Sequence, residues 1–229
     1  MYHVLNRGNA RSTLFEDDAA YGAFEELLAE GHQKAPMRTL AYCLMPNHWH
    51  LVLWPRKDGD LSRFLRWVTM THTQRFHAAH GTAGYGHVYQ GRFKSFPVAS
   101  ADADRHYFAV CRYVERNALR GRLVRRAERW RWCSLYHRAA GGEGSAPFLA
   151  EGPEPWPANW TELVNAPQTA EELAALRRCA QRCRPFGPEK SIKRIAKRFG
   201  LESTLRPRGR PRKAKAKDTN RHGKARKGS

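Results

Sequence analysis

Two histidines separated by one residue, His48 and His50, are the side chains in this sequence best placed for metal chemistry. Pro46-Asn47 predicts a tight turn, and residues 48–54 that follow it have strand character. Because successive side chains of a strand point to opposite faces, both imidazoles should share one face and could bind a divalent cation together. The chain has eleven histidines, so the spacing alone leaves a structural role equally open.

A second pair, Tyr113 and Asn117, lies on a helix predicted over residues 101–119. Residues four apart stack on the same helix face, and Tyr113 lies one step from the apolar stripe that includes Val114. We therefore expect a half-buried phenol at the edge of a cleft, with an amide oxygen one turn away that could be a third metal ligand. Taken alone, the tyrosine could be a packing residue and the asparagine a polar group near a helix end.

Together these residues would suit phosphodiester transesterification. The Tyr113 oxygen would attack phosphorus, a 3′-hydroxyl would leave, and the protein would stay joined to a 5′-phosphate. A free tyrosine has a pKa of about 10, so the phenol needs help at neutral pH. A metal ion could polarise the phosphate, and arginine or lysine could offset the developing charge.

The elements that position these residues follow a recognisable order. Apolar periodicity predicts, in sequence, strand 2–6, helix 17–31, strands 38–45 and 48–54, helix 60–79, a strand-like segment 87–98, and helix 101–119. This β-α-β-β-α-β order is typical of the split βαβ, ferredoxin-like arrangement, an α+β fold with two helices packed on an antiparallel sheet. The strand with the two histidines should be central, which gives a site a rigid support.

Composition indicates a polyanionic partner. The 229 residues carry a formal charge of +20, and 41% are hydrophobic, which is enough for a substantial core. We see neither a signal peptide nor a membrane-spanning stretch, so a cytoplasmic, nucleoid-associated protein is expected. Five cysteines, odd in number and without a Cys-x-x-Cys pair, predict reduced thiols.

The C-terminal third differs in composition. We expect a catalytic domain over 1–138, a Gly/Pro-rich linker with short helices over 139–204, and a basic tail over 205–229. The short helices are predicted at 169–182 and 189–199. The tail holds eleven Lys or Arg against one Asp and should be disordered when alone. Its Gly-Arg-Pro core resembles an AT-hook, although a generic polybasic tail that binds phosphates is the favoured interpretation. The arginines that would contact DNA there are Arg208, Arg210 and Arg212.

Two motifs together resemble a known family. The first runs from Pro46 to Val52 and contains His48 and His50, and the second runs from Tyr113 to Val124. They resemble the single-tyrosine HUH transposases, and within that superfamily the REP-associated tyrosine transposases. Supporting stretches are Asn6–Asn9, Gln90–Ser95 and Gly200–Pro211. The family often has Asn-Pro where this chain has Asn117-Ala118, which removes a proline but keeps the proposed ligand.

The resemblance implies a HUH-type fold that binds Mg²⁺ or Mn²⁺ and no organic cofactor. It implies that single-stranded DNA hairpins with REP-like palindromes are cleaved and transferred through a covalent 5′-phosphotyrosine. In that scheme the metal ligands are His48, His50 and Asn117, and Tyr113 is the nucleophile. The resemblance leans towards a monomer, although the sequence leaves the oligomeric state open. As further DNA contacts we predict Arg7, in a loop after the first strand, and Arg92 and Lys94, on one face of their strand.

Two other functions compete with this one. The first is a non-catalytic binder or regulator of palindromic nucleic acid that keeps the fold. The presence of all four candidate residues argues against it, because a protein that no longer catalyses the reaction could lose any of them. These residues are His48, His50, Tyr113 and Asn117. The second is a hydrolytic nuclease that uses metal-bound water and forms no adduct with the protein.

Overall fold

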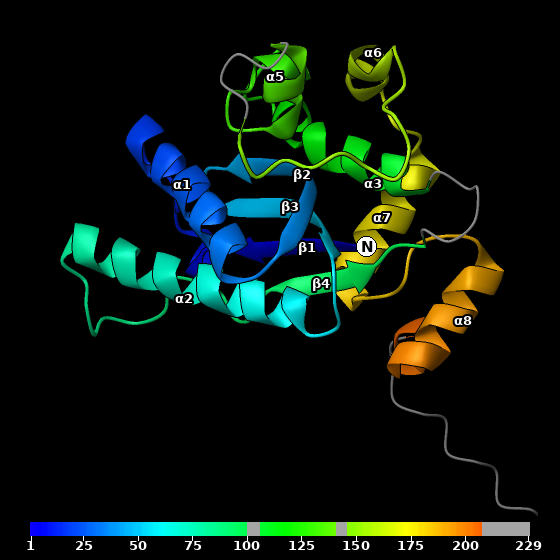
Figure 1. Cartoon of the computed structure of the whole chain (residues 1–229), viewed down its shortest axis with the longest axis horizontal. Helices are drawn as coiled ribbons and strands as arrows, with labels where there is room; N and C mark the ends of the chain where they lie inside the picture. Colours follow the sequence, from blue (N-terminus) through cyan, green and yellow to red (C-terminus); the bar gives the residue numbers. More distant parts are fainter. Residues whose placement is uncertain (100–105, 141–145, 208–229) are drawn as a thin grey trace, which may run out of the picture.

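Four strands form the sheet that carries the two histidines. The computed structural model describes residues 1–99, 106–140 and 146–207 (Figure 1). Within these ranges the strands are β1 (Tyr2–Arg7), β2 (Met37–Met45), β3 (His48–Pro55) and β4 (Lys94–Pro97). They are ordered β2-β3-β1-β4, and all neighbouring pairs are antiparallel. This is the order of a split βαβ sheet, so the predicted α+β class and the central position of β3 are confirmed.

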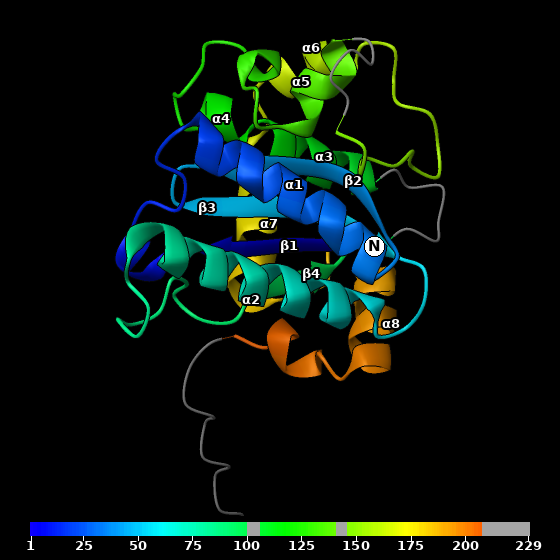
Figure 2. The ribbon, with the colours of Figure 1, turned by 60° about the vertical axis from the view of Figure 1, so that its left-hand side comes forward.

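Two helices, α1 (Asp18–Lys34) and α2 (Asp60–His80), cover one face of the sheet side by side (Figure 2). The side chain of Asp17 accepts a hydrogen bond from the backbone N–H of Ala20 and so caps the start of α1. The helix α2 ends at Gly81, whose positive φ of 61° suits a glycine cap. Both helices match their predictions, and the core between them and the sheet includes Trp49 and Leu51 of β3.

The opposite face of the sheet is crossed by α3 (His106–Glu115), and α4 (Asn117–Arg120) continues from it. Residues 101–105 of the predicted helix 101–119 lie outside the described ranges. The rest is divided at Arg116, which differs from the continuous helix expected. The Asn117 amide nitrogen donates to the carbonyls of Tyr113 and Val114, at 3.2 and 3.1 Å. Such bonds from a side chain to the backbone compete with regular helical pairing, which accounts for the division.

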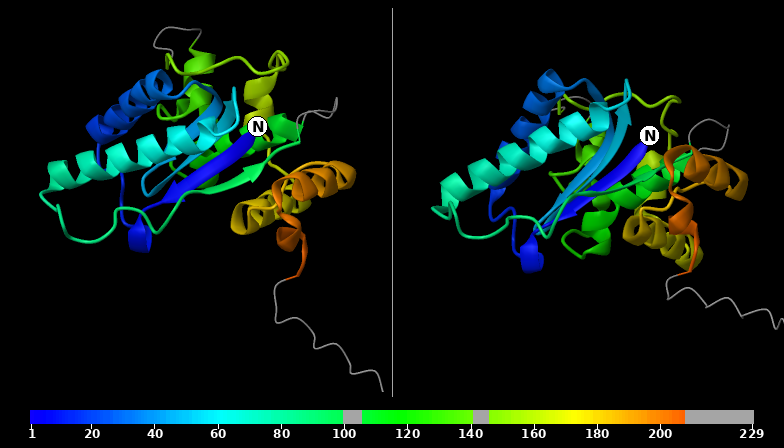
Figure 3. Two further views of the ribbon diagram at one scale, coloured as in Figure 1. Left: turned by 60° about the horizontal axis from the view of Figure 1, so that its bottom comes forward. Right: turned by 90° about the horizontal axis from the view of Figure 1, so that it is seen from below.

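The C-terminal region packs onto this second face and onto the β4 edge. Its helices are α5 (Ser134–Ala139), α6 (Trp160–Asn165), α7 (Ala170–Arg182) and α8 (Glu189–Phe199). The last two match the predicted short helices and lie beside β4 (Figure 3). Within the predicted Gly/Pro-rich linker over 139–204, α6 is a short helix that the sequence analysis did not locate. Short 3₁₀ turns occur at Asn9–Arg11, Ala127–Arg129 and Glu202–Leu205.

The predicted strand-like segment over residues 87–98 is shorter in the structure. Only Lys94–Pro97 forms a strand, although Tyr89 makes an isolated bridge to Gly8 and the Gln90 N–H donates to the Arg7 carbonyl. The five cysteines are all free thiols, as predicted. Among the described helices, none is both long and apolar enough to cross a membrane.

A row of arginines fastens the segment before α7 to the α3–α4 face. Arg112 donates from Nε to the carbonyl of Leu163 at 2.6 Å and from Nη2 to the carbonyl of Ala166 at 2.8 Å. One turn on, Arg116 donates to the carbonyl of Val164 at 2.7 Å. Arg120 closes the row with a long contact of 3.4 Å to the Gln168 side chain. These charged donors satisfy carbonyls that α6 and the following turn leave unpaired, and they thereby fix where α7 begins.

A buried carboxylate joins α3 to the C-terminal helices. Glu115 is fully buried and accepts hydrogen bonds from the Ser134 hydroxyl at 2.5 Å and the Trp160 indole at 2.6 Å. It also pairs with the guanidinium of Arg138. A charge this deep is stable only while its partners remain, so Glu115 should be a stability determinant of the tyrosine-bearing face.

We expect Glu115→Ala to lower the free energy of unfolding by about 3–5 kcal/mol, because it leaves the largely covered guanidinium of Arg138 without its counter-charge. Urea denaturation followed by circular dichroism measures this loss. Glu162→Ala removes an exposed glutamate from α6 and should change the free energy by less than about 0.5 kcal/mol. Equal unfolding midpoints for the two variants would contradict the assignment.

Candidate active site

The pairing of β1 with β3 sets which side chains face α3. In the antiparallel register, Arg7 lies opposite His48, Leu5 opposite His50, and His3 opposite Val52. Because β3 alternates, Trp49 and Leu51 enter the core under α1 and α2, while the two imidazoles point to the other face. The predicted common face is therefore present, and the two ring centroids lie 5.1 Å apart.

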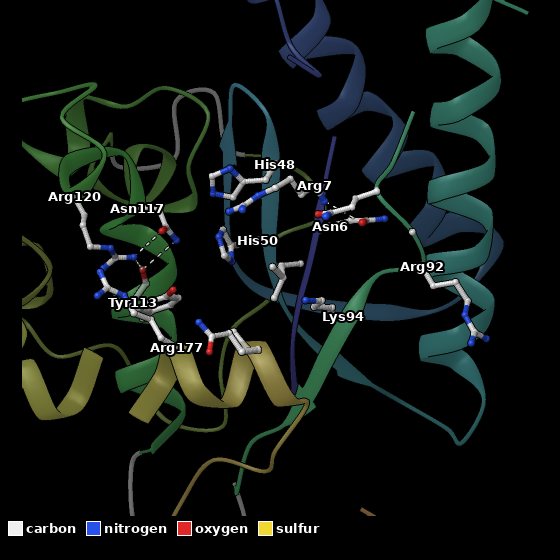
Figure 4. A pocket seen from close by; sticks show the side chains of 15 residues that line it. Asn6, Arg7, His48, His50, Arg92, Lys94, Tyr113, Asn117, Arg120 and Arg177 are labelled. Atoms are coloured by element: carbon white, nitrogen blue, oxygen red, sulfur yellow. Dashed lines mark hydrogen bonds between the residues drawn. The ribbon is translucent and has the colours of Figure 1, made fainter. Parts of the chain in front are cut away.

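A cleft of about 600 Å³ opens in front of these imidazoles (Figure 4). Its walls come from β1 and β3, from residues 90–94, from α3 and α4, and from α7. Among the described residues that line it, none is acidic and five are cationic: Arg7, Arg92, Lys94, Arg120 and Arg177. A concave, positively charged surface of this kind attracts and holds anions.

Each imidazole uses its Nδ1 atom inside the protein. His48 Nδ1 lies 2.7 Å from the side-chain oxygen of Asn47, and His50 Nδ1 lies 2.9 Å from Nε2 of His3. Within the described residues, no hydrogen bond is made by Nε2 of either ring. An engaged Nδ1 with an open Nε2 is the usual arrangement of a metal-binding histidine.

Burial keeps both imidazoles neutral. It lowers the pKa of His48 to about 4, and the nearby positive charges of Arg7 and Arg120 act in the same direction. Burial also holds the pKa of His50 well below its usual range, with His3 and His48 adding to the effect. Since only a neutral imidazole can donate a lone pair to a metal, both rings have the net charge that metal binding requires at neutral pH.

Tyr113 reaches this cleft from α3 of the same chain. Its ring lies edge-on to His50, with 6.0 Å between centroids and an interplanar angle of 86°. The guanidinium carbon of Arg120 lies over the ring, 4.3 Å from the centroid. The side chain is more buried than expected, with 8% of its surface exposed, because α7 closes the cleft beside it.

Asn117 is near the imidazoles, but its amide oxygen is already engaged. Arg120 donates from Nη2 to that oxygen at 2.6 Å, and the amide nitrogen donates to backbone carbonyls. The orientation of the amide is fixed, since the reverse would set an N–H group against a guanidinium. Arg120 thus occupies one of the two lone pairs of the Asn117 oxygen, and the role of Asn117 as a third metal ligand stays a prediction.

The two imidazoles fit a divalent cation, and the remaining donors would have to come from elsewhere. Within the described residues, there is no group of three or more His, Cys, Asp or Glu side chains that could hold a metal. The lining residues that the structure describes supply no negative charge to offset a dication. An anionic ligand such as a phosphate would supply both the missing charge and the missing oxygen donors.

The three predicted basic contacts all line the cleft, with two corrections. Arg7 is the last residue of β1 and not part of the following loop, because its backbone still pairs with His48. Arg92 precedes β4, so it does not share a strand face with Lys94, and its side chain extends away from the imidazoles (Figure 4). Arg208, Arg210 and Arg212 lie outside the described residues.

Four cleft or near-cleft residues escaped the sequence prediction: His3, Arg120, Arg177 and Gln181. Arg120 follows Asn117 by three residues, a spacing at which side chains meet on a helix, so it could have been found. The helix α7 was predicted, but its amphipathic pattern does not say which surface it covers. His3 had no signal, because its partner is 47 residues away.

Replacing Arg120 by methionine should free the Asn117 oxygen and remove a positive charge from the cleft. We expect Mn²⁺ to bind the DNA-free protein about tenfold more tightly than it binds the wild type, as judged by electron paramagnetic resonance of free Mn²⁺. Arg177→Met removes a charge from the α7 wall without touching Asn117 and should give a smaller gain. If both variants bind Mn²⁺ like the wild type, Arg120 does not restrain the ligand.

Comparison with known proteins bears on this site. No curated protein matches the chain. Among solved structures, one resembling it is a REP-associated tyrosine transposase bound to a REP hairpin, with 18% identity and a TM-score of 0.49, covering 69% of this chain and 88% of that one. Another is a protein from Deinococcus radiodurans R1 described as a candidate transposase, with 14% identity and a TM-score of 0.36, covering 50% and 87%.

The family comparison is decisive. Residues 1–117, which include β1, both histidines, Tyr113 and Asn117, match the family described as "Transposase IS200 like". The resemblance expected from the two sequence motifs is confirmed at this level. Since the match spans more than half of the 229 residues, the chain belongs to the IS200-like transposase family.

Proposed function

We propose that this protein cleaves and rejoins single-stranded DNA at palindromic hairpins through a covalent bond between Tyr113 and a 5′-phosphate. One observation carries the proposal: a phenol, two neutral imidazoles and five cations line one cleft, and no acidic side chain is among its described lining residues. Membership of the transposase family supports DNA as the substrate. The hairpin rests on the resemblance of the two motifs to those of REP-associated tyrosine transposases.

The charge of the cleft favours a phosphodiester over other substrates. Arg7 and Lys94 lie on the β1 and β4 side, and Arg120 and Arg177 lie on the α4 and α7 side. A strand that passes between these walls would present phosphates to cations on both sides. The same cations would stabilise the extra negative charge that develops on phosphorus during transfer.

The proposed step exchanges one phosphoester bond for another. The Tyr113 oxygen forms a bond to phosphorus while the bond from phosphorus to the 3′-oxygen breaks. The phenolic proton is released, and the departing oxygen takes up a proton to become a 3′-hydroxyl. The resulting phosphotyrosyl bond keeps the energy of the broken linkage, so attack by another 3′-hydroxyl can rejoin the strand.

Residues of this chain prepare the phenol for attack. The guanidinium carbon of Arg120 lies 4.3 Å from the centroid of the Tyr113 ring, where its positive charge would offset negative charge that develops during the attack. When bound at His48 and His50, a divalent cation would polarise the phosphate as a Lewis acid.

The two histidines and the tyrosine of the proposed site all come from one chain. His50 and Tyr113 come from β3 and α3 of the same molecule, with 6.0 Å between their rings. A second copy is therefore not needed to bring the nucleophile to the histidines. This geometry supports a protein that acts as a monomer.

The non-catalytic binder keeps one observation in its favour, which is the engaged oxygen of Asn117. A protein that only binds DNA needs the cations of the cleft but does not need a metal-ligand atom with an available lone pair. Covalent capture of DNA separates the two functions, because only the transferase forms an adduct. It also excludes the hydrolytic nuclease, which would cleave without an adduct.

Tyr113→Phe should retain hairpin binding and lose the adduct, because the ring still packs but the attacking oxygen is gone. The assay incubates the protein with a labelled single-stranded hairpin carrying flanking sequence, in Mn²⁺, and resolves the products on a denaturing gel. Tyr85→Phe removes the hydroxyl of an exposed tyrosine outside the cleft and should leave adduct formation unchanged. An adduct that persists in Tyr113→Phe would rule out this nucleophile, and cleavage without any adduct would favour the nuclease.

A second test concerns the α7 wall. Arg177 lines the cleft, whereas Arg178 is exposed on the same helix and does not. We expect Arg177→Met to weaken binding of single-stranded DNA and to reduce the slope of log K against log salt concentration by about 0.7, the value for one phosphate contact. Arg178→Met should leave the slope unchanged. Fluorescence anisotropy at several salt concentrations measures both, and equal slopes would remove α7 from the DNA path.

A further inference from the structure

A third histidine lies directly behind the two in the cleft. His3 on β1 is fully buried and faces α3, as His50 does. Its ring is nearly parallel to that of His50, with centroids 5.1 Å apart and planes 19° apart. Phe96 also packs against His3, with 4.8 Å between the ring centroids. His3 is not among the residues that line the cleft, so it can act on a ligand there only through His50.

The contact between the two rings is a hydrogen bond between nitrogens. Nε2 of His3 lies 2.9 Å from Nδ1 of His50, so one of the two atoms carries the proton and the other accepts it. The distance is the same for both arrangements. What differs is the state of the other nitrogen of His50, Nε2, which is the atom open to the cleft.

The two arrangements give His50 opposite chemical properties. If His3 donates, neutral His50 carries its own proton on Nε2 and can only donate a hydrogen bond to a ligand. If His50 donates from Nδ1, its Nε2 has a free lone pair and can bind a metal. The proton on the shared bond therefore decides which kind of group His50 presents.

The buried Nδ1 of His3 favours the first arrangement in the free protein. Among the described residues, this atom has no hydrogen-bond partner. In the second arrangement it would carry a buried, unpaired N–H group, whereas in the first it is a bare nitrogen. A ligand that binds Nε2 of His50 must outweigh that difference.

We propose that His3 is a positioning residue that accepts the Nδ1 proton of His50 and so presents the Nε2 lone pair to a divalent cation. Binding would move the shared proton from His3 to His50. The Nε2 proton of His50 would be released, and Nδ1 of His3 would take one up, so both rings stay neutral. The inference rests on the metal site of the proposed function and adds a residue to its support.

Substitutions at His3 separate this role from simple packing. His3→Phe keeps an aromatic ring but cannot accept a proton, and we expect it to weaken Mn²⁺ binding by about 10–100-fold. His3→Gln retains an acceptor oxygen and should recover part of the loss. The matched control is His72→Phe, because His72 is also buried and hydrogen-bonded, to Tyr89 on the other face of the sheet. This control should bind Mn²⁺ like the wild type.

Electron paramagnetic resonance of free Mn²⁺ gives these affinities, and circular dichroism verifies that each variant is folded. Wild-type affinity in folded His3→Phe would overturn the role of His3 while leaving the metal site intact. If the wild type binds Mn²⁺ no better than a His48→Ala/His50→Ala double variant does, the metal site of the proposed function fails instead. Equal losses in His3→Phe and His72→Phe would show a packing effect and would also overturn the proposal.

Nuclear magnetic resonance tests the wild type without any substitution. Long-range ¹⁵N–¹H correlation spectra distinguish the two neutral forms of an imidazole. We expect His50 to carry its proton on Nε2 in the free protein and on Nδ1 when Zn²⁺, a diamagnetic probe, is added. A His50 that keeps its Nε2 proton at saturating Zn²⁺ would overturn the inference.

Discussion

The antiparallel pairing of β1 with β3 is the constraint on which the candidate site depends. Its register sets Arg7 beside His48 and turns His3 and His50 to the same face. A slip of one residue would move both imidazoles into the core beneath α1 and α2 and would bring Trp49 out to the cleft. The apolar side chains of Trp49 and Leu51 oppose such a slip, because their burial stabilises only one register. The packing of the core on one face of the sheet therefore determines which side chains face the cleft on the other.

The parts of the site that the sequence predicts are those that depend on local periodicity. Alternation in a strand places His48 and His50 together, and helical spacing places Tyr113 near Asn117. The partners of these residues are set by long-range packing, which leaves no periodic signal. His3 meets His50 only because β1 and β3 pair, and α7 reaches the cleft only because Arg112 and Arg116 hold the segment before it. The position of Arg92 was wrong for a related reason, since strand propensity does not say where pairing begins.

The charge of the cleft bears on the metal site proposed at His48 and His50. Among the described residues that line the cleft, two neutral imidazoles accompany five cations and no carboxylate, so a dication entering by itself would meet repulsion. A phosphodiester changes this balance, because it neutralises the cations and offers oxygen donors. By thermodynamic linkage, the factor by which a bound DNA phosphate raises the affinity for metal equals the factor by which the metal raises the affinity for DNA. Arg120 contacts both the side-chain oxygen of Asn117 and the ring of Tyr113, so binding of a metal ion or a phosphate in the cleft would change its interactions.

The C-terminal region takes part in the same site by way of α3. The helix carries Arg112 and Arg116 on its outer side and Tyr113 on its inner side, so one element both holds the segment 163–168 and aims the phenol. Residues beyond the family match at 1–117 thus complete the cleft, since Arg177 and Gln181 form its α7 wall. A displacement of the segment 163–168, which leads into α7, would leave the two arginines without their carbonyl partners. Because an unpaired charged donor is costly, these bonds oppose a movement of the segment that positions the α7 wall beside Tyr113.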